Sequence, residues 1–194
     1  MIEAADNKDM AAHDLTKRWI SEHIRIVFNG NGYSEEWIEE AARRGLPNIN
    51  NTVDAHAALS DPKAIALFER HKVMTRNELI SREEVGYETY AKDINVEART
   101  MLDMAKKEIL PAVIRYTMTV AKSVNEIEAA GAKPHVQKRI LDQCQAHLSD
   151  MYKALDDLEE VTQKAASMET GRAQAVFYRD EVVRAMEQLR KPAD

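Results

Sequence analysis

Glycine and proline are scarce in this sequence. The 194 residues include 6 glycines and 5 prolines, whereas a sheet-rich fold needs a turn about every 8–12 residues. Aromatic residues make up 6% of the chain and charged residues 31%, a composition typical of long helices. We therefore predict an all-α fold.

The sequence also lacks a basic excess, a long apolar run and a cysteine pair. Its 27 Lys and Arg against 33 Asp and Glu give a net charge of −6, so no nucleic-acid partner is expected. It contains neither the run of about 18 apolar residues that crosses a membrane nor the apolar segment of a signal peptide. The single cysteine, Cys144, cannot form an internal disulfide, which predicts a cytoplasmic location.

Two helices are expected before residue 48. The second begins after Ser34 as its N-cap, and it ends where Gly45 suits the left-handed conformation and Pro47 prevents continuation. The first covers about residues 9–27, with a broad apolar face at helical spacing. This face consists of Leu15, Trp19, Ile20, Ile24 and Val27.

Two clear start signals follow a looser stretch at 48–60. Asp61-Pro62 places an N-cap before a proline at the first helical position. Thr75 and Glu78 have the spacing of a capping box, in which each residue bonds the other's backbone N–H. We predict a cluster of short helices over residues 1–75, followed by long helices over 76–194.

The later part of the chain predicts long helices joined by short connections. One continues through Pro111 as a kinked helix and ends near residue 130. Its expected inward positions are Leu102, Ala105, Ile109, Val113, Tyr116, Val120, Val124 and Ile127. After a tight connection, a helix of roughly 35 residues carries a coiled-coil-like seam. The seam consists of Leu141, Cys144, Leu148, Met151, Leu155, Leu158, Thr162 and Ala165.

A third helix after Thr170-Gly171 repeats the apolar spacing. Short connections between long helices favour antiparallel packing. The fold expected for residues 76–194 is therefore a long antiparallel hairpin that becomes a three-helix arm.

No pattern of catalytic or metal-binding residues emerges. None of the six histidines forms the Glu-x-x-His pair of a di-iron bundle. Cys144 and His147 lie one turn apart, but a metal site needs three or four ligands, so we interpret them as a buried thiol beside a surface histidine. Met101, Met104 and Met118 are interpreted as core residues.

Two N-terminal features have simple structural interpretations as well. Gly30-Asn31-Gly32 lacks the remainder of a phosphate-binding loop, so we interpret it as a turn between helices. The carboxylates in 35–40 are interpreted as a solvated helix face rather than a cation site; they are Glu35, Glu36, Glu39 and Glu40. We therefore assign no catalytic, cofactor-binding or metal-binding residue.

One run of residues is more distinctive. It reads Phe28-Asn29-Gly30-Asn31-Gly32-Tyr33-Ser34-Glu35-Glu36-Trp37 and continues through Glu40-Ala41-Ala42-Arg43-Arg44-Gly45-Leu46. This run resembles the segment that follows the catalytic core in type III glutamine synthetases, the large bacterial form. The similarity continues at 67–73, 100–112, 178–180 and 185–190, so it covers nearly the whole chain from Leu15 onward.

The resemblance implies a C-terminal region without the catalytic core. Enzymes of this family are ligases of nitrogen metabolism that make glutamine from glutamate, ammonia and ATP, with Mg or Mn held on a sheet-rich domain. None of their catalytic residues has a counterpart here, so the fragment alone is expected to be inactive and to hold no cofactor. The family's stacked hexameric rings imply other subunits of a homo-oligomer as partners, and a role in packing, assembly or regulation. A free-standing helical interaction module is the alternative.

Overall fold

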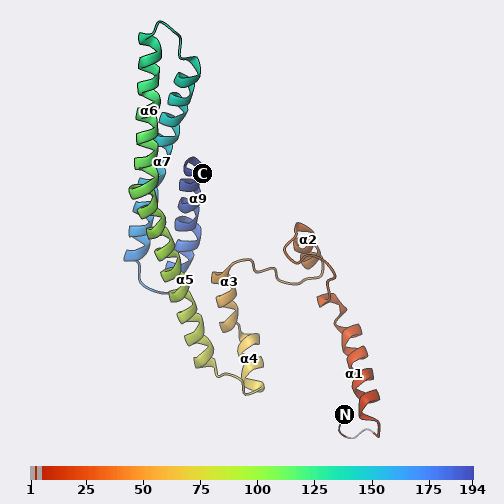
Figure 1. The fold of residues 1–194 in the computed structure, drawn as a ribbon. Coiled ribbons are helices and arrows are strands. Elements are labelled where there is room, and N and C mark those ends of the chain that lie inside the picture. The colour runs from red at the N-terminus through yellow and green to blue at the C-terminus, as the bar shows by residue number, and fades with distance from the viewer. Residues whose placement is uncertain (1–2, 4–5) are drawn as a thin grey trace. The chain divides into compact units, whose positions relative to one another are not determined.

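The computed structural model describes residues 3 and 6–194, and each regular element in those residues is a helix or a helical turn (Figure 1). The predicted all-α class is confirmed. The chain divides into two compact units, Met1–Asn50 and Asn51–Asp194. Each unit is described by itself.

The described residues of the first unit form two α-helices. Helix α1, Lys8–Glu22, begins where the side chain of Asn7 accepts a hydrogen bond from the Met10 amide at 3.1 Å. A 3₁₀ turn follows, η1, Ile24–Ile26. The helix expected over 9–27 is therefore an α-helix extended by one tighter turn. Helix α2 is Glu35–Arg43.

The two ends of α2 differ in how well the sequence predicts them. Gly45 adopts φ +67°, and the Leu46 amide donates to the Ala41 carbonyl at 2.9 Å, which is the glycine-terminated C-cap expected there. Ser34 occupies the N-cap position, but its side chain caps no helical amide. Its hydroxyl donates to the Asn31 carbonyl at 2.8 Å instead, so the side chain is oriented toward the preceding turn and the predicted side-chain cap is wrong.

The second unit begins with short helices. These are α3 (Thr52–Ala57), the 3₁₀ turn η2 (Ala58–Ser60) and α4 (Pro62–Arg70). They pack on the first half of α5 (Arg76–Met104). This grouping differs from the division expected from the sequence, 1–75 and 76–194, because residues 51–75 contact the long helix that follows them.

The start signals of α4 and α5 are confirmed. Asp61 accepts a hydrogen bond from the Lys63 amide at 2.8 Å. At α5, the Glu78 amide donates to the Thr75 hydroxyl at 3.3 Å, and the Glu78 carboxylate accepts from the Thr75 amide at 2.7 Å. Both halves of the capping box are therefore present.

Helix α5 continues without interruption into a π-helical turn, η3 (Ala105–Ile109), and then into α6 (Leu110–Ala129). The helix thus passes through Pro111 as predicted. In a π-turn each bond spans five residues rather than four, and the buried residues Ala105, at its start, and Leu110, directly after it, are five apart. Beyond the turn, Val120 and Val124 are buried as expected, but Thr117 is 6% exposed whereas Tyr116 is 54% exposed. The expected inward position of Tyr116 is therefore wrong, because the neighbouring Thr117 takes that place in the interface.

Helix α7, His135–Ser167, returns beside α6 to form the predicted hairpin (Figure 1). Gly131, at φ +80°, makes the connection. Every seam position of α7 faces inward to some degree. The seam positions farther from the tip of the hairpin are buried, whereas those nearer the tip, Leu141, Cys144 and Leu148, are half-buried. The seam is therefore correctly placed, although it is fully covered only at the base.

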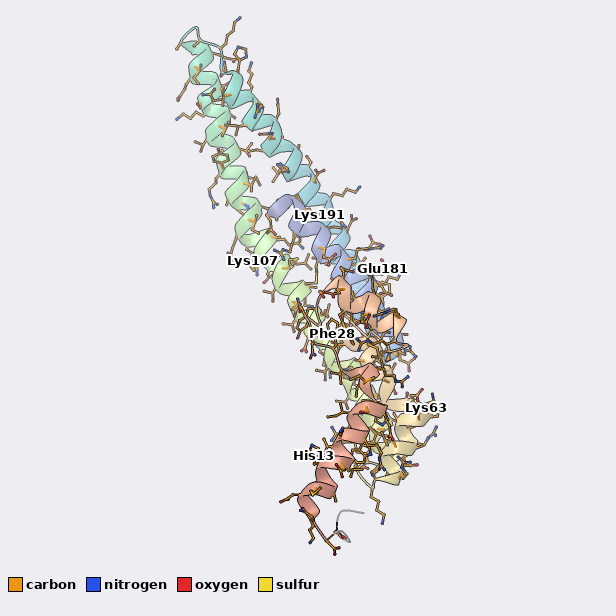
Figure 2. The ribbon with its side chains drawn as sticks, turned by 90° about the vertical axis from the view of Figure 1, so that its right-hand side faces the viewer. His13, Phe28, Lys63, Lys107, Glu181 and Lys191 are labelled. Atoms are coloured by element: carbon orange, nitrogen blue, oxygen red, sulfur yellow. The ribbon has the colours of Figure 1, made fainter. Side chains whose placement is uncertain are left out.

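The third helix runs through α8 (Arg172–Phe177), a second π-turn, η4 (Tyr178–Val182), and α9 (Val183–Ala193). It packs on α7 and ends partway along the hairpin, so the bundle has three helices at its base and two beyond (Figure 1). In Figure 2, Glu181 marks η4, Lys191 marks α9, and Lys107 marks the π-turn η3 between α5 and α6. The main core lies where the three helices meet.

Candidate functional site

The distinctive N-terminal run folds into a small aromatic cluster. The rings of Phe28 and Trp37 lie 4.6 Å apart between centroids, and the Arg44 guanidinium lies 6.0 Å from the centre of the Phe28 ring. A Cβ at position 30 would lie 2.6 Å from the Phe28 ring, so Gly30 is needed for this packing. The Gly30-Asn31-Gly32 segment therefore forms a turn whose role is structural.

Arg44 also ties α2 to the end of η1. It donates to the carbonyls of Arg25, at 3.1 Å, and Val27, at 2.6 Å, and it pairs with Glu40. Glu40 accepts a second arginine, Arg43, from Nε at 2.8 Å. These bonds, first from Arg43 and then from Arg44, hold the pKa of Glu40 below its usual range.

The acidic residues of α2 do not form a metal centre in the part of the chain that the structure describes. Glu40 is committed to the two arginines, and Glu35, Glu36 and Glu39 are exposed. Among the described residues there is no group of three or more His, Cys, Asp or Glu side chains that could hold a metal ion.

The apolar face predicted for α1 and η1 is present but uncovered. Its exposed fractions are 56% for Trp19, 54% for Ile20, 59% for Ile24 and 42% for Val27, and α1 contains no buried residue. Single exposed apolar residues are ordinary, but several on one helix face mark an interaction surface. We name these four residues the α1 face.

In the second unit, Arg179 connects two segments that are far apart in sequence. From η4 it donates to Asp54 on α3 at 3.0 Å and to its own neighbour Asp180 at 2.7 Å. Its bonds lower the pKa of Asp180. The pKa of Asp54 is lowered first by a hydrogen bond from Asn51, the N-cap of α3, and further by Arg179. Arg179 therefore fastens the first helix of this unit to the last.

A tyrosine lies beside this junction. Tyr87 is 3% exposed and donates its hydroxyl to Glu83 at 2.7 Å, while the His56 ring meets it edge-on with centroids 6.0 Å apart. Burial, together with the bond to Glu83, raises the pKa of Tyr87 to about 12. Tyr87 thus stays protonated at neutral pH and acts as a structural donor.

The remaining predicted features lie apart from these clusters. His147 is exposed as expected, but Cys144, which was expected to be a buried thiol, is only half-buried on the seam. Met101 packs against the core, but Met104 and Met118 are 46% and 66% exposed. The interpretation of these last two methionines as core is wrong, since Met118 lies on the outer side of α6 and Met104 borders an open groove.

That groove runs between the α5–η3 helix and α9. Its volume is about 440 Å³. Its walls are largely apolar and include Met101, Met104, Ile109, Met186 and Leu189. Glu97, Arg190 and Asp194 also line it, and its largely apolar walls suit contact with apolar groups.

Sequence reasoning missed Arg179 and Asp54 as partners. The only signal available was the run 178–180, which carries part of the family resemblance. A pairing across 125 residues follows no local spacing rule, so only the packed structure identifies it.

Comparison with known proteins gives these features a context. The family model "Glutamine synthetase C-terminal domain" matches residues 11–128. A glutamine synthetase of Butyrivibrio fibrisolvens is 34% identical over 183 residues, which is 93% of this chain and 26% of that protein. A type-3 glutamine synthetase of Dictyostelium discoideum is 30% identical over 201 residues, 97% of this chain and 26% of that protein.

A third relative extends the match to the full chain. The glutamine synthetase of Bacteroides fragilis is 26% identical over 200 residues, covering 100% of this chain and 27% of that protein. The chain thus spans about a quarter of the length of the curated relatives it matches. None of the described helices is long and apolar enough to span a bilayer. The resemblance inferred from sequence is confirmed: this chain belongs to the glutamine synthetase C-terminal domain family.

Proposed function

We propose that this chain is a non-catalytic helical part of a glutamine synthetase and that it serves the packing of that enzyme. The family match and the quarter-length coverage of its relatives support this proposal. The whole enzyme would join ammonia to glutamate in the cytoplasm, with ATP and Mg or Mn bound outside this chain. Other subunits of a homo-oligomer would be its partners.

The observation that carries the proposal is the α1 face. Trp19, Ile20, Ile24 and Val27 are each between 42% and 59% exposed. Full burial of such a side chain contributes about 1.5–3 kcal/mol, so covering this face would hold two parts of a protein together. The aromatic cluster of Phe28 and Trp37 follows directly in sequence and would fix the direction in which the chain leaves that contact.

The first test is enzymatic. The purified chain, supplied with glutamate, ammonia, ATP and magnesium, should form no glutamine. Formation of glutamine would overturn the proposal. An upstream reading frame that encodes a catalytic domain continuous with Met1 would support it, whereas an unrelated upstream sequence would favour the free-standing interaction module.

The second test addresses packing. In the full-length enzyme that carries this region, Trp19→Asp should reduce the assembled mass measured by light scattering, because it places a charge on the α1 face. Lys17→Asp, at an exposed position outside that face, is the matched control and should leave the mass unchanged. Equal masses for the two variants would contradict the assigned surface.

A further inference from the structure

A second groove lies between the α5–η3 helix and α7. Its volume is about 550 Å³. Val96 and Leu102 contribute apolar wall, and Arg99, Lys106 and Gln163 contribute polar groups. It combines apolar walls with charged side chains, as small-molecule sites do.

The charges in this groove leave one cation free. Lys106 joins the two walls by pairing with Glu159 at 2.6 Å, and Asp103 pairs with Lys107 at 2.6 Å. Arg99 has no ion pair or hydrogen bond with any residue that the structure describes. The unmatched charge of the groove is therefore a guanidinium, whose planar fork suits a carboxylate.

The same groove is lined by a threonine with unused hydrogen-bonding capacity. Thr162 is 4% exposed, and its Oγ1 has no hydrogen-bond partner among the described residues. Thr100 and Thr119, by contrast, donate to the carbonyl four residues earlier. A buried hydroxyl without a partner is costly, so Thr162 is a second, independent indication of a missing ligand.

The local backbone adds a third indication. Lys106 lies within the π-turn η3, and π-turns inside α-helices occur frequently at functional sites. The turn places Lys106 against α7, where it reaches Glu159. A ligand that displaced Glu159 from Lys106 would therefore contact this long helix at its π-turn, η3.

We propose that this groove binds a small aliphatic carboxylate. Arg99 takes the carboxylate through two parallel N–H bonds, while Thr162 and Gln163 supply further donors. The aliphatic part lies against Val96 and Leu102. Phosphate is disfavoured because its second charge would face the carboxylates of Asp103 and Glu159. The proposal concerns this chain's own residues and does not depend on the packing role proposed above.

The test is an NMR titration of the purified chain with butyrate, at constant ionic strength. Saturable amide shifts confined to about residues 96–106 and 159–163 are expected, with a Kd on the order of 1 mM. Arg99→Gln should weaken binding about tenfold, as expected for loss of one charge-assisted pair. Arg115→Gln, which removes an exposed arginine of α6, should leave the Kd unchanged.

Thr162→Val separates binding from stability. It keeps the side-chain shape, so a purely structural threonine predicts an unchanged or higher melting temperature and unchanged butyrate binding. The proposed role predicts weaker binding at that same or higher melting temperature. The proposal is overturned if butyrate gives no saturable shifts at tens of millimolar, if phosphate shifts the same amides equally, or if Arg99→Gln and Thr162→Val both bind as the parent does.

Discussion

The imidazole of His56, on α3, lies directly against Gly86, in the middle of α5. A Cβ at position 86 would lie 2.5 Å from the ring, closer than two atoms can pack without a shift. Gly86 is otherwise unfavourable inside a helix by about 1 kcal/mol relative to alanine. The glycine therefore allows α3 to approach α5 at a local cost to the helix.

This contact predicts that Gly86→Ala destabilises the chain. We expect the free energy of unfolding to fall by about 1–2 kcal/mol, the overpacking penalty less the gain in helix propensity. In the His56→Ala background the same substitution should instead raise stability by up to about 1 kcal/mol. Urea denaturation of the four proteins measures both effects. The same sign in both backgrounds would show that the ring is not the obstacle.

The Arg179–Asp54 pair predicts local rather than global protection of α3. Arg179→Ala should speed amide hydrogen exchange in 52–60, because it removes the bond at 3.0 Å that fastens α3 to η4. Arg184→Ala is the matched control, since Arg184 forms its ion pair with Glu181, three residues away. Equal exchange in the two variants would mean that α3 is held by apolar packing alone.

The capping box predicts an acid-sensitive start of α5. Hydrogen bonds from the Thr75 amide, and then from its hydroxyl, lower the pKa of Glu78. Its stabilising effect is therefore complete above the unfolded-state pKa of about 4.3 and is lost as the pH falls through the lower folded-state value. The stability difference between the parent chain and Glu78→Gln should shrink from pH 6 to pH 3. Glu84→Gln, an exposed site on the same helix, should show no such trend.

The seam of α7 predicts a gradient of mutational cost along the hairpin. Leu158 is fully buried, whereas Leu141 near the tip is half-buried. Leu158→Ala should cost about 2–5 kcal/mol because it leaves a cavity in the three-helix base, and Leu141→Ala should cost less. Thermal and urea denaturation would measure both. Equal costs would mean that the tip of the hairpin is also covered in solution.

The turn between α4 and α5 predicts a stabilising substitution. Lys72 adopts φ +55°, and it is the only described residue other than glycine with a positive φ. A side chain there carries a steric cost that glycine avoids. Lys72→Gly should raise stability by about 0.5–1 kcal/mol. Gly45→Ala, at φ +67°, is the converse variant and should lower it.

The N-terminal unit shows how far local signals extend. Its helices and the Gly45 ending follow from residues a few positions apart, so the sequence predicts them. The Ser34 side chain is oriented toward the Asn31 carbonyl and caps no helical amide. The packing of Arg44 on Phe28 had no sequence rule behind it, although both residues lie in the run that indicated the family.

By itself, the sequence determined the helical class, the family and most helix boundaries, because caps and glycine turns act over three or four residues. Only the tertiary structure decided which faces are covered. Packing against α7 left Thr117 inward and Tyr116 outward. His56 and Arg179 hold α3 against helices that begin 20 or more residues away. Such choices depend on contacts between distant segments, whose energies no local pattern of residues records.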